Sequence, residues 1–76
     1  MEKEFKEIID RMLELPEKIS IAETQLGSDL EKLRDEQKNT YKIIKEGLEF
    51  MLKWDLTHEQ IIFNNEKNRF EKKHSI

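Results

Sequence analysis

Hydrophobic residues recur at helical spacing along most of the chain. From Ile19 onward they are separated by alternating intervals of three and four residues, the pattern of a left-handed coiled-coil seam. The seam positions are Ile19, Ala22, Leu26, Leu30, Leu33, Gln37, Thr40, Ile44, Gly47, Met51 and Trp54. The interval of four is repeated once, between Leu26 and Leu30, which shifts the phase as a stutter does. The pattern predicts a long helix over 17–54 with a stripe that a neighbour must cover.

The segment before this seam also has a helical pattern. Residues 2–15 are predicted to form a helix with one apolar face, made of Phe5, Ile8, Ile9, Met12 and Leu13. Pro16 then either begins the second helix or kinks a continuous one. Gly27 precedes Ser28 and Glu31, which have the spacing of an S-x-x-E capping box. The helix over 17–54 is therefore either continuous or broken at 27–28.

The C-terminal segment is predicted to be a third, shorter helix over 57–73. Thr57 and Gln60 have the spacing of a capping box, and Ile61, Ile62 and Phe70 supply apolar positions after it. The apolar stripe widens after residue 40, which favours this helix folding back on the end of the long one. The expected fold is one all-α domain over 1–76: a long coiled-coil-like helix with a short helix folded back at its C-terminal end.

Composition favours self-association. The chain has 76 residues, 41% of them charged, and no cysteine. A domain this small buries only about 60% of its unfolded surface, and disulfides are excluded as reinforcement. We therefore expect a homo-oligomer, most simply a dimer. No apolar run approaches the roughly 20 residues of a membrane span, and Met-Glu-Lys-Glu-Phe does not resemble a signal peptide. The expected location is the cytoplasm, away from membranes.

Charge is unevenly distributed along the chain. Residues 1–36 carry 11 acidic and 6 basic side chains, whereas residues 37–76 carry 6 acidic and 8 basic ones. An acidic half argues against a protein that coats nucleic acid, because duplex binding depends on phosphate neutralisation by Lys and Arg. Local contact through the basic C-terminal segment remains an alternative.

Candidate chemistry is sparse. His58 and His74 lack the spacing of a helical zinc site, since Ile62 lies four residues after His58. The carboxylates lie among lysines on predicted solvent faces and lack the desolvated pocket that acid–base catalysis needs. The chain is expected to be no enzyme and to bind neither metal nor cofactor.

A polar cluster near the C-terminus is the predicted partner-binding surface: Asn65, Lys67, Asn68 and Arg69. Asparagines are poor helix formers, so their concentration in a predicted helix suggests another reason for their presence. Arg69 is the strongest candidate, because a guanidinium can form a bidentate pair with a carboxylate or phosphate. A purely structural interpretation is also open: the segment is a weakly folded polar helix whose cations complement its own C-terminal dipole.

One family resemblance supplies context. The run Leu15-Pro16-Glu17-Lys18-Ile19, then Ala22-Glu23 and the Leu26, Leu30 and Leu33 ladder, resembles small coiled-coil proteins of phage and mobile-element recombination and replication modules. Asn65 and Arg69 match a spacing common in their C-terminal helices. The resemblance implies a phage or mobile-element origin and no particular chemistry. We therefore predict a non-enzymatic protein–protein interaction module, an adaptor or inhibitor, with a nucleic-acid accessory protein as the alternative.

Overall fold

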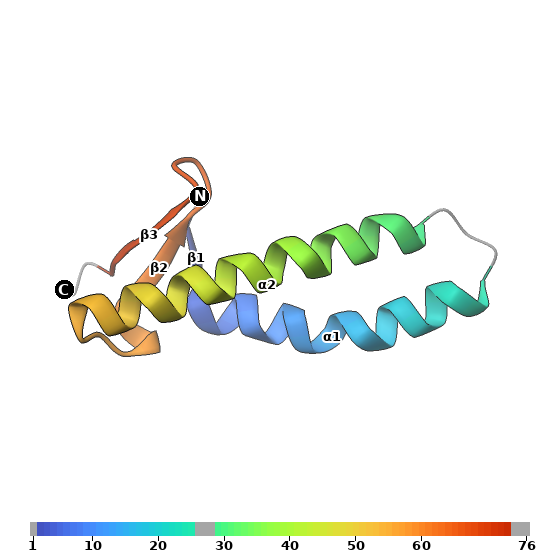
Figure 1. The fold of residues 1–76 in the computed structure, drawn as a ribbon, viewed down its shortest axis with the longest axis horizontal. Helices are drawn as coiled ribbons and strands as arrows, with labels where there is room; N and C mark the ends of the chain where they lie inside the picture. Colours follow the sequence, from blue (N-terminus) through green and yellow to red (C-terminus); the bar gives the residue numbers. More distant parts are fainter. Residues whose placement is uncertain (1, 26–28, 74–76) are drawn as a thin grey trace.

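The structure, a computed structural model, describes residues 2–25 and 29–73. Its elements in chain order are β1 (Glu2–Glu4), α1 (Phe5–Thr24), α2 (Asp29–Trp54), the short 3-10 helix η1 (His58–Gln60), β2 (Ile61–Asn64) and β3 (Arg69–Lys72). The two helices lie side by side as an elongated hairpin, and the three strands form a small sheet against one end of it (Figure 1). Helical content is high, as predicted, but the fold is mixed α/β and the all-α prediction is wrong.

The long helix over 17–54 is replaced by parts of two helices. α1 continues through Pro16 to Thr24, and α2 begins at Asp29. Pro16 is exposed and lies inside α1, where it lacks the N–H that would bond to the carbonyl four residues earlier, and the helix continues past it. The predicted stop at Gly27 and cap at Ser28 lie outside the described residues.

The predicted third helix over 57–73 is also wrong. The T-x-x-Q signature does act locally, because the Gln60 side chain accepts a hydrogen bond from the Thr57 N–H at 2.8 Å. It starts only the single turn η1, after which the chain becomes extended. Ile61, Ile62 and Phe63 are β-branched or aromatic, and such residues favour a pleated, buried strand.

The sheet has β2 at its centre, with β1 and β3 antiparallel to it on either side. Lys3, Phe63 and Phe70 are aligned across the three strands. Phe63 and Phe70, seven residues apart in sequence, are therefore cross-strand partners, with ring centroids 5.0 Å apart. The seven-residue spacing of these two aromatic residues therefore results from pairing across a hairpin, and not from two turns of the predicted helix over 57–73.

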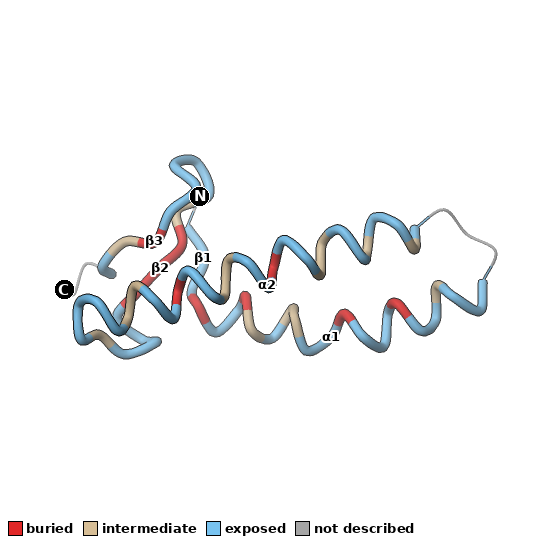
Figure 2. Tube along the Cα trace, viewed as in Figure 1, coloured by how far each residue is buried: buried red, intermediate tan, exposed pale blue. Residues whose placement is uncertain are grey.

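The core lies where the sheet meets the hairpin. Its buried cluster consists of Phe5, Ile8, Ile61, Phe63 and Phe70, with Phe50, Met51 and Leu56 among the partly buried side chains around it. Buried positions gather at this end, and few extend along the rest of the hairpin (Figure 2). A Cβ at Gly47 would lie 2.3 Å from Phe5 Cε1 and 2.8 Å from Phe70 Cζ, so the absent side chain is what admits both rings.

The predicted oligomer seam is divided between the two helices of one chain. Ile19 lies on α1, Leu26 lies outside the described residues, and the others lie on α2: Leu30, Leu33, Gln37, Thr40, Ile44, Met51 and Trp54. Ile19 and Thr40 are buried within the single chain, whereas Trp54 is half exposed. Much of the stripe that was expected to face a second chain therefore packs inside the hairpin.

Candidate functional site

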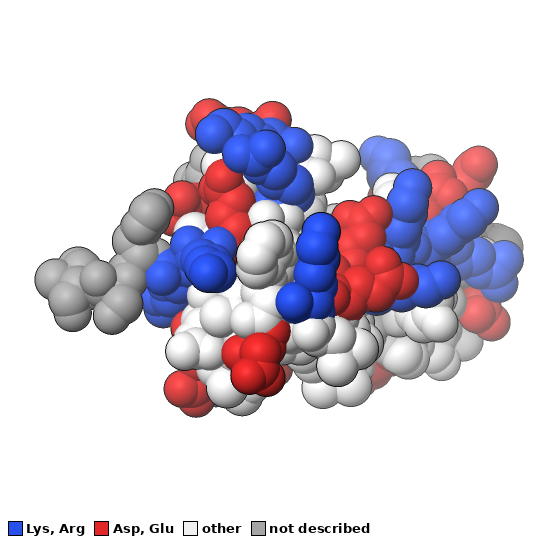
Figure 3. Space-filling model, turned by 60° about the vertical axis from the view of Figure 1, so that its left-hand side comes forward, with Lys and Arg blue, Asp and Glu red and all other residues white. Residues whose placement is uncertain are grey.

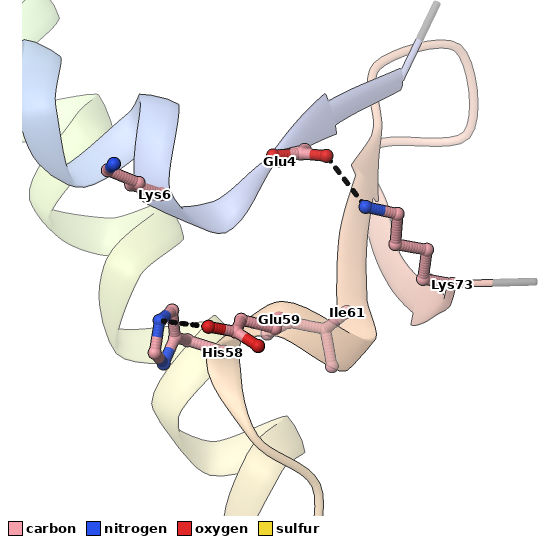
Figure 4. A pocket seen from close by; sticks show the side chains of 6 residues that line it. All are labelled: Glu4, Lys6, His58, Glu59, Ile61 and Lys73. Atoms are coloured by element: carbon pink, nitrogen blue, oxygen red, sulfur yellow. Dashed lines mark hydrogen bonds and ion pairs between the residues drawn. The ribbon is translucent and has the colours of Figure 1, made fainter. Parts of the chain in front are cut away.

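Several hollows border the sheet, and the one in Figure 4 is lined mainly by charged side chains. It measures about 400 Å³ and is bounded by Glu4, Lys6, His58, Glu59, Ile61 and Lys73. Lys73 Nζ donates to Glu4 Oε1 at 2.7 Å, which lowers the pKa of Glu4 and raises that of Lys73. His58 Nε2 lies 3.8 Å from a Glu59 oxygen. Apart from Ile61, these side chains are exposed, so the charges are solvated and the Glu4–Lys73 pair links the first strand to the chain beyond the last.

The second hollow, of about 380 Å³, lies on the side of the hairpin that the sheet covers, beside Ile8, Ile43 and Phe63. Arg11 donates from Nε and Nη2 to the two carboxylate oxygens of Glu36, the second bond being 2.9 Å long. This bidentate pair joins α1 to α2, and the Arg11 hydrogen bonds hold the pKa of Glu36 below its ordinary value. Its function is to fix the two helices together.

Metal binding finds no support among the residues that the structure describes. Within them, no three His, Asp or Glu side chains are grouped so that they could hold a metal ion. His74 lies outside the described residues, and His58 is exposed next to Glu59.

The predicted partner-binding residues come together at the tip between β2 and β3. Asn65, Lys67 and Asn68 form the turn and Arg69 begins β3, all of them exposed. Asn68 has φ 54°, in the left-handed region that asparagine tolerates better than most residues. Asn68 therefore has a role in the turn.

Asn64 completes this turn. Its Oδ1 accepts hydrogen bonds from the backbone N–H groups of Glu66 and Lys67 at 3.0 and 3.1 Å, which is how asparagine side chains commonly initiate turns. Arg69 Nη2 donates to Glu71 Oε2 at 3.2 Å within the same strand. An Asn-rich stretch between Ile61–Phe63 and Phe70 is a hairpin signal, and it was available in the sequence.

The largest exposed apolar side chains lie elsewhere, on the hairpin itself. On α2, Tyr41, Leu48 and Leu52 are 64%, 48% and 84% exposed, and their spacing of seven and four residues places them on one stripe. On α1, Leu13 is 72% exposed, and the partly buried Ile9 and Met12 lie next to it. We call the surface made by Ile9, Met12, Leu13, Tyr41, Leu48 and Leu52 the open face.

The two halves of the open face lie on the same side of the hairpin. Glu23, eleven residues or three turns after Met12, lies 3.6 Å from Arg34, seven residues or two turns before Tyr41, so the stripes that contain Met12 and Tyr41 meet near the far end of the hairpin. The opposite side carries the Arg11–Glu36 pair and the sheet. The sheet therefore covers one side of the hairpin and leaves the open face in solvent. In the sequence, Tyr41, Leu48 and Leu52 belong to the apolar stripe that widens after residue 40.

Trp54 is the remaining exposed aromatic side chain of note, at 50% exposure. The ammonium groups of Lys53 and Lys72 each lie 5.4 Å from the centroid of its ring. Figure 3 shows charged side chains of both signs interspersed over the molecular face that it displays. A short basic and aromatic cluster thus exists within a surface of mixed charge.

Comparison with known protein families, curated proteins and solved structures finds no match for this chain. No helix among the described residues is long and apolar enough to cross a membrane.

Proposed function

We propose that this protein is a non-enzymatic protein–protein interaction module, an adaptor or inhibitor, that docks through the open face of its helical hairpin. One observation carries the proposal: Leu13, Tyr41, Leu48 and Leu52 are largely exposed and lie together on one side of the hairpin. Contiguous exposed apolar patches are uncommon on monomeric proteins and mark interaction sites. The predicted phage or mobile-element origin and cytoplasmic location stay predictions.

The shape of the molecule supports this proposal. The chain extends 47 Å along its long axis and about 20 Å across. The sheet packs against one end only, so most of the hairpin is a two-helix layer with no third layer on the open side (Figure 1). Helical partners commonly bind by packing their own apolar face against exposed apolar side chains. Tyr41 is the natural anchor, because tyrosine is enriched at interface hot spots.

Site-specific photo-crosslinking in the cells that produce the chain tests the proposal. A photoreactive phenylalanine analogue is introduced at Tyr41 or Leu52, with Asn39 as the control position. Asn39 is exposed on the same helix and, two residues from Tyr41, points about 200° away around it. We expect a discrete protein adduct from Tyr41 and Leu52 and none from Asn39. Equal labelling at the three positions, or no adduct at any of them, would contradict the proposal.

Nucleic-acid binding is a second candidate, favoured by the Trp54 cluster. An exposed aromatic ring with flanking cations is the arrangement on which single-stranded bases stack, and Lys53 and Lys72 supply those cations. Such binding weakens steeply as salt is added. Titration of Trp54 fluorescence with single-stranded oligonucleotides at two salt concentrations tests it.

A further inference from the structure

Charged side chains on the open side of the hairpin have a self-complementary pattern. On α2, Lys38 and Lys45 lie on either side of Tyr41, at intervals of three and four residues. On α1, Asp10 and Glu17 lie on either side of Leu13, again at intervals of three and four. In each case two like charges about 10 Å apart enclose one exposed apolar residue. The two helices thus carry the same spacing with opposite sign.

Within residues 2–25 and 29–73, these four charges have no ion-pair partner. All four side chains are exposed, and none forms an ion pair with another described residue. Their surroundings reinforce the contrast, because residues 38–45 contain three lysines and no acidic residue. Residues 7–17 contain four acidic residues and one arginine, Arg11, which is bound to Glu36 and Glu14.

Leu13 on α1 and Tyr41 on α2 also lie at similar heights along the axis of the hairpin. Phe5 lies directly against Gly47, which fixes the relative level of the two antiparallel helices. Leu13, eight residues after Phe5, is therefore level with residue 39, eight residues before Gly47, because both helices rise by about 1.5 Å per residue. Leu13 and Tyr41 thus lie at nearly the same level, about 12 Å from the Phe5–Gly47 contact.

We propose that the open face is covered by a second copy of this chain, related by a two-fold axis parallel to the helices, so that the two hairpins form a four-helix bundle. This inference rests on the proposed function and names its partner. The axis brings α1 of each copy antiparallel onto α2 of the other at the same level. Leu13 then packs beside the partner's Tyr41, with Asp10 facing the partner's Lys45 and Glu17 facing the partner's Lys38. Symmetry repeats each contact, as in any isologous dimer.

The central apolar contact supplies the affinity, and the charges set orientation. Stable interfaces bury about 800 Å² on each partner, more than the exposed parts of a few side chains provide. The flanking charged stems and the rest of both helices must therefore join the interface. Opposite charges at matching spacing select one register and orientation, and in this arrangement both sheets lie at the same end of the bundle.

Paired charge reversal tests the inference. One variant combines Lys38→Glu with Lys45→Glu, and the other combines Asp10→Lys with Glu17→Lys. Self-association is measured by sedimentation equilibrium at low ionic strength, with helicity checked by circular dichroism. Lys32→Glu is the control, since Lys32 is exposed on α2 away from the open face.

We expect the unmodified protein and the Lys32→Glu variant to form dimers. Each reversed variant should self-associate at least tenfold more weakly, because like charges then face each other in both halves of its dimer. An equimolar mixture of the two reversed variants should regain a heterodimer, since every facing pair is again opposite in sign.

Two outcomes would overturn the inference. If the unmodified protein stays monomeric while Tyr41 and Leu52 crosslink to a different protein, the docking face stands and the second copy is the wrong occupant. If it dimerises but charge reversal has no effect and mixing restores nothing, the dimer uses another surface. Loss of every crosslink would instead count against the docking face itself.

Discussion

Substitution of Gly47 by alanine tests the packing that positions the whole hairpin. The added Cβ would lie 2.3 Å from Phe5 Cε1 and 2.8 Å from Phe70 Cζ, whereas carbon atoms in contact prefer about 3.5–4.0 Å. Phe5 is 1% exposed and Phe70 is 7% exposed, so neither ring can retreat into solvent. The helix would have to move away from α1 and the sheet.

Two opposing effects determine how much Gly47→Ala changes the free energy of unfolding. Overpacking of a filled core costs about 1–3 kcal/mol, and two buried rings at these distances place Gly47→Ala towards the upper end. Alanine is favoured over glycine in a helix by about 1 kcal/mol. We therefore expect a net loss of about 1–2 kcal/mol, a large share of the roughly 5–15 kcal/mol typical of small domains.

Urea denaturation followed by circular dichroism at fixed protein concentration measures this loss. Asn39→Ala, at an exposed position of the same helix, is the matched control and should raise the free energy of unfolding by a few tenths of a kcal/mol. In a Phe5→Leu background, Gly47→Ala should cost less, because one of the two clashing rings is absent. If Gly47→Ala is as stable as the unmodified protein, Phe5 does not lie against Gly47 and the two helices are aligned at a different level.

Three further predictions concern other contacts. Acidification below pH 4.5, the ordinary pKa of a glutamate, should destabilise the protein, because Arg11 lowers the pKa of Glu36 and protonation of Glu36 removes the ion pair. The stability of Glu36→Gln should depend less steeply on acid pH, and a pH profile identical to that of the unmodified protein would contradict this role of Glu36. Asn68→Ala should lower the free energy of unfolding by about 1 kcal/mol because its φ is 54°, whereas Asn68→Gly should be neutral or better. If Trp54 binds single-stranded nucleic acid, the double substitution of Lys53 and Lys72 to Gln should weaken binding about tenfold and flatten its salt dependence; identical titrations would exclude the second candidate function.

The helices were predictable from the sequence because their apolar residues recur over many turns. The seam from Ile19 to Met51 was interpreted as a contact between chains, but periodicity does not say whether the helical surfaces in contact belong to one chain or two. A break near Gly27 was one of the two alternatives, and the antiparallel packing of α1 and α2 takes up much of the stripe within the chain.

The sheet was not predicted, for three separate physical reasons. β1 is a three-residue strand, Glu2–Glu4, in which every side chain is exposed and charged, so it has no apolar pattern. The capping signature at Thr57 and Gln60 is real, but it starts a single turn and gives no information about length. Phe63 and Phe70 are spaced equally well for two helical turns or for opposite positions across a four-residue turn, and only the β-branched run and the asparagines distinguish these.

The candidate site was likewise predictable only in part. Asn65 and Arg69 were predicted to bind a partner because asparagine is unusual in a helix, but these residues lie in a turn and at the start of β3. The open face depends on which side of the hairpin the sheet covers, and this requires the tertiary structure. Its members Leu13 and Tyr41 belong to the apolar patterns of the sequence, but their exposure could not be read from those patterns.

Solvent accessibility of the open-face side chains as a function of protein concentration shows most directly whether a second copy covers that face. Methyl signals of Leu13, Leu48 and Leu52 are followed by NMR in the presence of a soluble paramagnetic agent, with the side-chain signals of Lys32, which is exposed on α2 away from the open face, as an internal reference. We predict that Leu13 becomes protected from the agent as concentration rises, while Lys32 stays accessible throughout. A Leu13 methyl that remains as accessible as Lys32 at every concentration would contradict the proposed dimer.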